Sequence, residues 1–365
     1  MKTLQQEIRF LPDSPISNEI FTESSFLFDI ETTGFSAKHS FVYLIGCAYR
    51  QGNTLFIEQF FAEKDTDETE IIEAFFELAK QFQSIITFNG LGFDLPYLQK
   101  RCELLALDMD LSHLYCIDIY KILSKFKKIF KLENLKQKSL ETFLGISRKD
   151  IYSGGELINI YMDFQQEKDE ELLQTILLHN AEDLSGMTDL LPLLSYAQFF
   201  QGNYTLSSYE RSSFQEYDNS VGLELIFTLT SKYPFPKRIS YGFHSVYMTG
   251  FQSEVKLKVK IYQGELKYFY SNYKDYYYLP DEDMAVHKSV AFYVDREFRT
   301  QAKAATCYSK KTGCFLPQYT EVFDPYFKRE YKDKHSYFEM TSEISGSNEK
   351  LTKYVEHILN YMLAK

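Results

Sequence analysis

The chain lacks several features that would place it in a specialised class of protein. Its five cysteines form no CxxC pair, which argues against a zinc site and against a disulfide framework. No apolar run reaches the roughly 20 residues that a membrane-spanning helix needs. No apolar segment of signal-peptide length follows basic residues at the N-terminus. We therefore expect a cytoplasmic protein with reduced thiols and no membrane partner.

An excess of basic residues is also missing, because the formal net charge is −11. Residues 1–200 carry 18 Lys and Arg against 31 Asp and Glu, whereas residues 201–365 carry 22 against 20. This balance argues at first against a polyanionic partner. A metal site built of carboxylates would nevertheless be acidic and still act on a polyanion, since bound cations reverse the local field. Net charge therefore does not decide the partner.

The pattern of apolar residues predicts a layered α/β fold for residues 24–200. Hydrophobic residues make up 44% of the 365-residue chain, which is enough for a sizeable core. Helical spacing begins after residues 67, 96 and 121. Strands are expected at residues 25–30, 41–49, 55–61, 84–88 and 114–119. This order predicts a mixed sheet flanked by helices.

The two ends of the chain differ from this central part. Residues 1–23 have weak periodicity and are interpreted as an N-terminal arm. Tyrosine becomes frequent after residue 200, with 21 of the 29 in residues 201–365, which we interpret as a smaller aromatic-rich α+β domain of unassigned role. Within it, residues 256–270 are expected to form a hairpin, residues 289–294 a strand, and residues 351–363 an amphipathic terminal helix.

An Asp-x-Glu pair ends the first expected strand, where residues 28–34 read FDIETTG. Side chains two apart on a strand share a face, so Asp29 and Glu31 would repel each other unless cations neutralised them. Hard cations such as Mg²⁺ prefer oxygen ligands, and Gly34 would let the backbone approach a substrate closely. Taken alone, two solvent-facing acids on an edge strand are the more economical interpretation.

Two further polar motifs follow. Residues 89–98 (NGLGFDLPYL) place Asp94 at the start of a helix, where an isolated Asp would be only an N-cap worth about 1 kcal/mol. Residues 179–183 (HNAED) put His179 and Asp183 one helical turn apart on one face. A histidine titrates near neutral pH and can act as a general base beside a metal-binding acid. The simpler alternative is a surface His–Asp pair, which contributes little.

In this order the three motifs are far more specific than any one of them. They resemble the three exonuclease motifs of the DEDD superfamily, which has a ribonuclease-H-like fold. The closest likeness is to bacterial predicted exonucleases of the YprB type. Intervening segments are similar to the same branch, namely CIDIY (116–120), SLE (139–141), and RKDI (148–151) with SGG (153–155) after it. The resemblance covers roughly residues 24–195 and does not extend into the C-terminal part.

The resemblance implies a metal-dependent nuclease. Four acids would hold two divalent cations, Mg²⁺ or Mn²⁺: Asp29, Glu31, Asp94 and Asp183. The implied mechanism is two-metal hydrolysis, in which the cations clamp the attacking water and the leaving 3′ oxygen. The usual outcome is 3′→5′ removal of nucleotides from DNA or RNA, with a single-stranded 3′ end as the expected partner. His179 matches the family's base in kind, but it stands four residues before Asp183, where the Tyr-type branch has its phenol, instead of five.

Other residues are expected to contact the nucleic acid or to support the site. By the resemblance, Asn89 and the backbone of Thr33 and Gly34 would lie near the terminal nucleotide. Asp118 is interpreted as the cap of the following helix in preference to a fifth metal ligand. Two alternatives on the same fold stay open: a catalytically inactive nucleic-acid-binding or assembly module, and a structure-selective endonuclease. The complete set of four acids argues against loss of activity.

A basic stretch between residues 121 and 138 interrupts the acidic half of the chain. Its lysines could follow a phosphate backbone, with Phe126 and Phe130 as stacking rings. An amphipathic helix with both phenylalanines in the core explains the pattern equally well. The lysines chosen as candidates for substrate binding are Lys125, Lys127 and Lys128.

Overall fold

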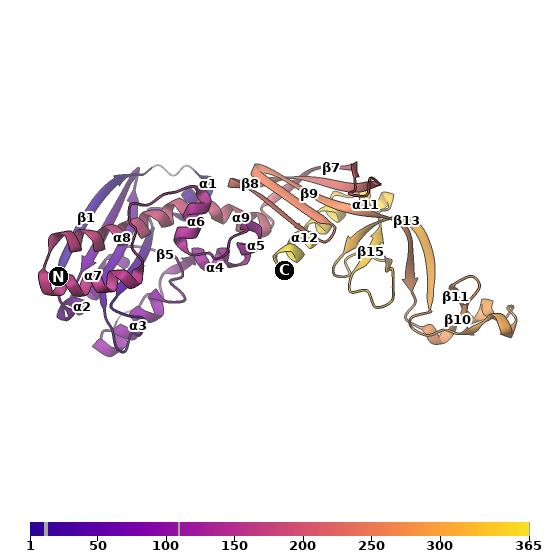
Figure 1. Ribbon diagram of the computed structural model, residues 1–365, viewed down its shortest axis with the longest axis horizontal. Coiled ribbons are helices and arrows are strands. Elements are labelled where there is room, and N and C mark those ends of the chain that lie inside the picture. Colours follow the sequence, from indigo (N-terminus) through magenta and orange to yellow (C-terminus); the bar gives the residue numbers. More distant parts are fainter. Residues whose placement is uncertain (11–13, 109, 365) are drawn as a thin grey trace. The chain divides into compact units, whose positions relative to one another are not determined.

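The computed structural model describes residues 1–10, 14–108 and 110–364. The chain forms two compact units, each shown in Figure 1. The first comprises Met1–Gln201 together with Tyr233–Lys237. The second comprises Gly202–Lys232 together with Arg238–Lys365.

A six-stranded mixed sheet forms the centre of the first unit, with strand order β1-β4-β3-β2-β5-β6. Strand β2 is antiparallel to β3 and parallel to β5, and β5 is parallel to β6. The strands are β1 (Lys2–Arg9), β2 (Ser25–Thr32), β3 (Val42–Gln51), β4 (Thr54–Phe61), β5 (Ser84–Thr87) and β6 (Tyr115–Asp118). The mixed α/β architecture predicted from the sequence is confirmed, with β2 deep inside the sheet.

Helices cover both faces of this sheet (Figure 1). The helices of this unit are α1 (Pro15–Ile20), α2 (Glu68–Ala79), α3 (Asp94–Leu105), α4 (Ile119–Leu123), α5 (Lys127–Phe130), α6 (Gln137–Leu144), α7 (Gly154–Glu167), α8 (Glu170–Leu190) and α9 (Leu194–Phe200). Short 3₁₀ turns, Asp65–Asp67, Ser124–Phe126 and Leu191–Leu193, adjoin α2, α5 and α9. Side chains alternate along β2, so the two faces of the sheet contact different helices. Phe28 packs on Phe75 of α2, while Asp29 turns to the opposite face and bonds Asn180 of α8.

The N-terminal segment departs from the expected arm. Strand β1 pairs with β4 along its whole length, from Lys2 opposite Phe61 to Arg9 opposite Thr54. Most of its side chains are exposed, so backbone hydrogen bonds at the sheet edge hold it in place. An edge strand of this kind needs little apolar alternation, which is why the sequence pattern gave no strand signal.

The second unit has its own six-stranded sheet, in the order β14-β15-β13-β9-β8-β7, and a small sheet in the order β11-β10-β12. On the large sheet, Tyr354 of the terminal helix packs on Phe227 and Phe338. The strands are β7 (Tyr204–Gln215), β8 (Val221–Phe243), β9 (Val246–Phe269), β10 (Tyr276–Leu279), β11 (Met284–His287), β12 (Thr300–Gln301), β13 (Tyr308–Gln318), β14 (Tyr326–Phe327) and β15 (Ser336–Glu339). The helices are α10 (Lys288–Ala291), α11 (Ser342–Ser345) and α12 (Asn348–Leu363), with 3₁₀ turns at Tyr273–Asp275 and Arg296–Phe298.

Two local predictions in this unit are wrong and one is confirmed. The expected hairpin over residues 256–270 is absent, because β9 continues through Gly264, which lies opposite Gly313 of β13. Pairing with β13 outweighs the local turn signal there. The expected strand at residues 289–294 begins instead with helix α10. The amphipathic terminal helix is present as α12.

One segment of the long strand β8 belongs to the first unit. Phe235 packs against Tyr196 and Phe199 of α9, with ring centroids 4.4 and 5.4 Å apart. The Tyr196 hydroxyl donates to the carbonyl of Lys237 at 2.5 Å. Residues 233–237 therefore complete the core at the end of α9. Among the described residues, no helix has both the length and the apolar character that a membrane span requires.

Candidate active site

Side chains from three elements of the first unit meet at one pocket with a volume of about 620 Å³. Strand β2 supplies two acids, the first residue of α3 supplies one, and α8 supplies an acid and a histidine. These lining residues are Asp29, Glu31, Asp94, Asp183 and His179, and Asn89 also lines the pocket. The structure therefore brings together the residues that the three sequence motifs indicate.

Asp29 is fixed by a chain of amide hydrogen bonds. Its Oδ2 accepts from Nδ2 of Asn180 at 2.8 Å, and Oδ1 of Asn180 accepts from Nε2 of Gln59 at 2.9 Å. Asn180 can lie against the sheet because β3 has a glycine there. A Cβ at Gly46 would be only 2.1 Å from Oδ1 of Asn180. The glycine is thus a requirement of this contact.

Asp94 differs from a helix cap. It is the first residue of α3, after Phe93, and only 7% of it is exposed. Its Oδ1 accepts from the backbone N–H of Ile30 at the long distance of 3.4 Å. Asp118, by contrast, accepts three backbone N–H groups, from Asn89, Leu91 and Lys121 at 2.9–3.1 Å. Asp118 is therefore the structural cap, as expected, and Asp94 is directed at the pocket.

His179 is buried and Asp183 is half-buried, so the two do not form a surface pair. Nε2 of His179 lies 3.2 Å from Oδ2 of Asp183 and 3.6 Å from Oε1 of Glu31. One ligand atom from each of these three residues lies within 4.8 Å of the other two. The second oxygen of Asp183, Oδ1, accepts from Nη1 of Arg148 at 2.5 Å. The two oxygens of Asp183 thus have different partners.

Burial and mutual repulsion raise the pKa of three pocket acids. Burial, followed by the charges of neighbouring acids, raises the pKa of Asp29 well above its usual value. Burial raises the pKa of Glu31 to about 8 although the charge of His179 opposes it, and burial raises the pKa of Asp94 to about 7. Burial acts the same way on Asp183, but His179 and Arg148 together bring its pKa below the usual value. The pocket therefore holds more carboxylates than the positively charged side chains beside it neutralise.

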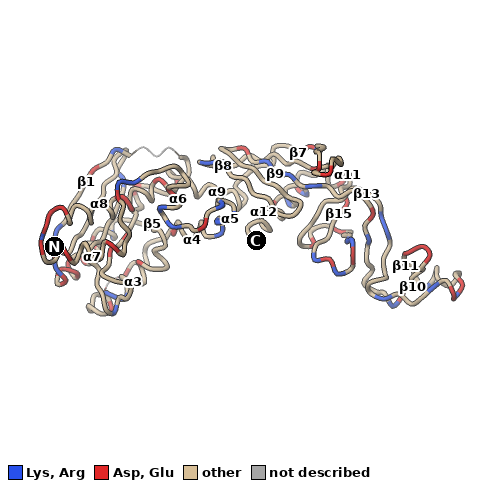
Figure 2. The backbone as a smooth tube through the Cα atoms, in the orientation of Figure 1, with Lys and Arg blue, Asp and Glu red and all other residues tan. Residues whose placement is uncertain are grey.

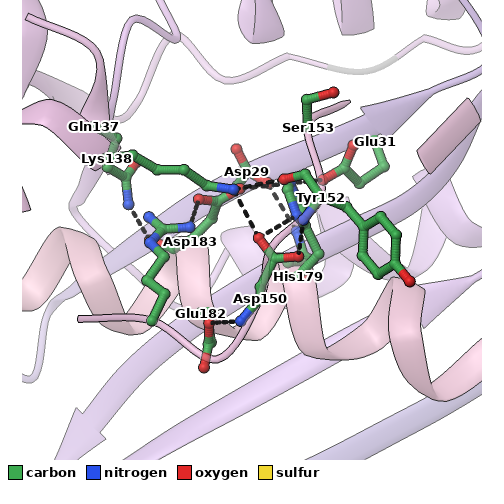
Figure 3. A network of polar contacts seen from close by, with 12 residues as sticks. Asp29, Glu31, Gln137, Lys138, Asp150, Tyr152, Ser153, His179, Glu182 and Asp183 are labelled. Atoms are coloured by element: carbon green, nitrogen blue, oxygen red, sulfur yellow. Dashed lines mark hydrogen bonds and ion pairs between the residues drawn. The ribbon is translucent and has the colours of Figure 1, made fainter. Parts of the chain in front are cut away.

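A network behind α8 supports the site, and Figure 3 shows its polar contacts. Arg148 bridges Asp183 and Glu141, and Asp150 accepts from Nδ1 of His179 at 2.8 Å. The Glu141–Arg148 pair lies against Gly186 of α8, where a Cβ would be 2.2 Å from Oε1 of Glu141. In the sequence these residues stand in two segments, 139–141 and 148–151, that carry only the resemblance and indicate no role. Their spacing from the site, 29–35 residues for the two long-range bonds, gives no local signal.

The structure does not bring every predicted binding residue to the pocket. Its described lining includes Lys136 but neither Thr33 nor Gly34, and the Thr33 hydroxyl accepts from the backbone N–H of Phe41. The candidate lysines Lys125, Lys127 and Lys128 also lie outside this lining.

These three lysines are exposed, and Figure 2 shows the basic residues of this segment in blue. Phe126 and Phe130 are buried, which corrects the suggestion that their rings stack on bases. Aromatic side chains that do line the pocket come from other positions: Phe88, Phe93 and Tyr120. Phe93 and Tyr120 stand inside segments that the sequence analysis singles out, but an aromatic residue there gives no sign of whether its ring faces a pocket or the core.

Residues 26–195 match the family model described as the RNase_H superfamily. This unit has a ribonuclease-H-like fold. The matched segment contains all four acids and His179. No curated protein matches the chain.

Two solved structures are similar to parts of the chain. One is the family B DNA polymerase from the hyperthermophilic archaeon Pyrobaculum calidifontis, with a TM-score of 0.39 and 20% identity over 48% of this chain and 25% of that one. The other is a moderately thermophilic Exonuclease I from Methylocaldum szegediense, with a TM-score of 0.28 and 9% identity over 57% of this chain and 54% of that one. The chain thus spans a quarter of the first protein and about half of the second.

Proposed function

We propose that the protein is a metal-dependent nuclease, and specifically a 3′→5′ exonuclease related to the YprB-type branch of the DEDD superfamily. The observation that carries the proposal is the convergence of four acids from β2, α3 and α8 on one pocket. Three of them have a raised pKa because they are buried near one another. Buried carboxylates in such numbers are stable as anions only when cations pair with them.

The chemistry of these donors fits two divalent cations. Asp29, Glu31, Asp94 and Asp183 supply hard oxygen ligands, which Mg²⁺ and Mn²⁺ accept. When bound, the two cations supply charge that stabilises the attacking and leaving oxygens of an in-line displacement at phosphorus. The protein's part is to hold the four carboxylates in place, and the amide chain through Asn180 does this for Asp29.

The rest of the pocket suits the end of a nucleic-acid strand. Rings of Phe88, Phe93 and Tyr120 offer faces for a base, and Lys136 offers a positive charge for a phosphate. A volume of about 620 Å³ accommodates a small number of nucleotide groups and not a duplex. We therefore propose a single-stranded 3′ end of DNA or RNA as the substrate.

The test is a product ladder. Full-length protein freed of metal is incubated with 5′-labelled single-stranded DNA, single-stranded RNA and duplexes, with Mg²⁺ or Mn²⁺ added. We expect products that shorten one nucleotide at a time from the 3′ end, and only when a cation is present. Internal fragments would favour a structure-selective endonuclease instead.

Two variants on helix α3 make the test specific. Asp94→Asn removes a pocket charge with little change of shape, and we expect it to abolish the ladder. Glu103→Gln is the matched control, because Glu103 is exposed, pairs with Lys100 at 2.6 Å and does not line the pocket. Strand binding without cleavage under all metals would favour the inactive binding module and reject the proposal.

A further inference from the structure

The two ring nitrogens of His179 have separate environments, which can be followed in Figure 3. The residue is only 4% exposed. Nδ1 lies 2.8 Å from Oδ2 of Asp150. Nε2 is on the pocket side, 3.2 Å from Asp183 and 3.6 Å from Glu31. The ring thus stands between a carboxylate behind it and two carboxylates in the pocket.

Asp150 is itself held firmly. Its Oδ2 also accepts from Nζ of Lys138 at 2.8 Å, and its Oδ1 accepts from the backbone N–H of Tyr152 at 3.0 Å. The Glu182 carboxylate accepts the backbone N–H groups of Lys149 and Asp150 at 3.1 and 2.8 Å. An ionised carboxylate can only accept hydrogen bonds, so Nδ1 of His179 must donate. Nε2 is then the nitrogen available to another partner.

In the metal-free protein Nε2 contacts Asp183 directly as a hydrogen-bonded ion pair. The same spacing also suits neighbouring ligands of one cation, and it is too short for two partners that share a water. Neighbouring ligands of an octahedral cation at 2.0–2.1 Å are about 3 Å apart. Two atoms that bond one water at about 2.8 Å each, at a tetrahedral angle, are about 4.6 Å apart. The observed separations of 3.2 and 3.6 Å are close to the first value. Asp183 can take part because Arg148 occupies only its other oxygen, Oδ1.

We propose that His179 is a metal ligand through Nε2, together with Glu31 and Asp183, and that Asp150 is the positioning residue that fixes its ring. This inference rests on the proposed function, because it takes the pocket to be a metal pocket. A carboxylate that holds the second nitrogen of a ligating histidine is a common support of metal sites. It assigns His179 a role other than the general base that the resemblance implies.

The proposal also determines which cation the pocket prefers. Mg²⁺ binds oxygen ligands almost exclusively, whereas first-row transition cations accept imidazole. A site with one nitrogen and two carboxylates therefore selects a cation such as Mn²⁺ over Mg²⁺. Lys138 pairs with Asp150 behind the ring, and Arg148 pairs with Oδ1 of Asp183, which leaves Oδ2 of Asp183 on the same side as Nε2.

The deciding experiment measures nitrogen directly. Mn²⁺ is titrated into the metal-free full chain, and pulsed electron paramagnetic resonance is used to detect coupling of the bound ion to ¹⁴N. We expect a ¹⁴N coupling in the parent protein that is lost in His179→Gln. Calorimetry should show that His179→Gln lowers the preference for Mn²⁺ over Mg²⁺ at least tenfold. Asp150→Asn should weaken Mn²⁺ binding 10–100-fold, as the loss of such a supporting group typically does.

His113→Gln is the matched control, because His113 bonds the backbone carbonyl of Ala79 and does not line the pocket. It should leave coupling and metal preference unchanged. If Mn²⁺ binds the parent protein without ¹⁴N coupling, His179 is not a ligand, and the inference fails while the proposed function stands. If Mn²⁺ does not bind at all, both fail. If His179→Gln does not fold by circular dichroism, ¹⁵N-histidine labelling of the parent protein decides, since a ligating His179 must change the coupling.

Discussion

Two groups of carboxylates lie on either side of His179 and Asp183, and they differ in how their charges are balanced by other groups of the chain. Behind the helix, Glu141 pairs with Arg148, Asp150 pairs with Lys138, and Glu182 accepts two backbone N–H groups. We call Glu141, Asp150 and Glu182 the brace acids. Each of them has a strong partner within the chain, so their charges stabilise the fold.

The pocket acids Asp29, Glu31 and Asp94 have much weaker partners among the described residues. Asp29 has the amide donor of Asn180, Asp94 accepts its own backbone N–H and that of Ile30 at 3.4 Å, and Glu31 has the ring of His179 at 3.6 Å. Their burial is comparable to that of the brace acids, yet their charge is not balanced from within. The difference indicates that the fold leaves this charge for a cation to balance.

The largest expected effect separates the two groups by activity. Asp29→Asn should lower the rate of hydrolysis by at least about 10³-fold, because one ligand of the cations is lost. The melting temperature of the metal-free protein should stay the same or rise, since the substitution removes repulsion within the pocket. Rates and calorimetric melting of the same preparation provide the check. An Asp29→Asn protein that cleaves at the parent rate would contradict the proposed site.

Substitution of a brace acid should lower the stability of the fold, in contrast to substitution of a pocket acid. Glu141→Gln leaves the buried Arg148 without one of its two carboxylates, and breaking such a pair costs about 3–5 kcal/mol. Urea unfolding should show this loss in the metal-free protein, at unchanged slope. If instead stability is retained and only cleavage is lost, the distinction between the two groups fails.

The pH dependence of stability should distinguish the pocket acids from the brace acids in the unsubstituted protein. The pKa of Glu31 is about 8 and that of Asp94 about 7 in the fold, both above their values in the unfolded chain. The native state therefore binds more protons between these limits, and the metal-free protein should become less stable as pH rises from about 5 to 8. A pKa shift of one unit corresponds to about 1.4 kcal/mol, so the fall should amount to several kcal/mol. Its main cause is burial, which makes ionisation of the two carboxyl groups costly.

Two comparisons sharpen this measurement. Asp94→Asn should flatten the part of the curve below about pH 7, and saturating Mn²⁺ should oppose the fall at high pH by stabilising the anions. The brace acid Asp150 has a lowered pKa although burial opposes it, since Lys138 and His179 favour its charged form. Its stabilisation should therefore be lost at the acid end, as pH falls through its folded pKa. If the stability of the metal-free parent protein rises steadily up to pH 8, the raised pKa values are contradicted.

A close approach of glycine to the brace allows a smaller test. An alanine in the middle of a helix usually stabilises it by about 1 kcal/mol relative to glycine. Gly186→Ala should instead destabilise the protein by about 1–3 kcal/mol, because the new Cβ would meet Oε1 of Glu141. Gly155→Ala, at a position with no atom within 4 Å of the added Cβ, is the control. Equal effects at both positions would show that the Glu141 side chain shifts to make room for the added Cβ.

The smallest expected effect concerns the exposed lysines. The variant in which Lys125, Lys127 and Lys128 are all replaced by Gln should reduce the salt dependence of single-strand binding. Each phosphate contact contributes about 0.7 to the logarithmic slope, so three contacts contribute about 2. Replacing Lys64, Lys80 and Lys100, which pair with acids of their own, is the control. An unchanged slope would make the first set ordinary solvated side chains.

The pocket acids could be predicted from sequence because each signal is local. Strand alternation alone places Asp29 and Glu31 on one face, and the order of the motifs adds Asp94 and Asp183. The brace could not be predicted in this way. Arg148 and Asp183 are 35 residues apart and meet only in the fold, where α6, which ends shortly before Arg148, packs on α8.

The errors of prediction share a physical cause. Strand β1 is held by backbone pairing with β4, which leaves no pattern in its side chains. Gly264 carries the local signal of a turn, but a partner strand that begins 39 residues after β9 ends keeps it extended. In both places long-range pairing outweighs local preference, as it often does in sheets.

The contribution of residues 233–237 to the first unit sets an order of events during synthesis. A ribosome releases the chain from its N-terminus, and domains usually begin to fold as they emerge. Here α9 appears well before Phe235, so its rings stay uncovered until more than thirty further residues have been made. The nascent ribonuclease-H-like unit therefore waits for a strand that the second unit shares. A fragment that stops at residue 201 would keep this waiting state permanently, with the faces of Tyr196 and Phe199 that pack on Phe235 left uncovered.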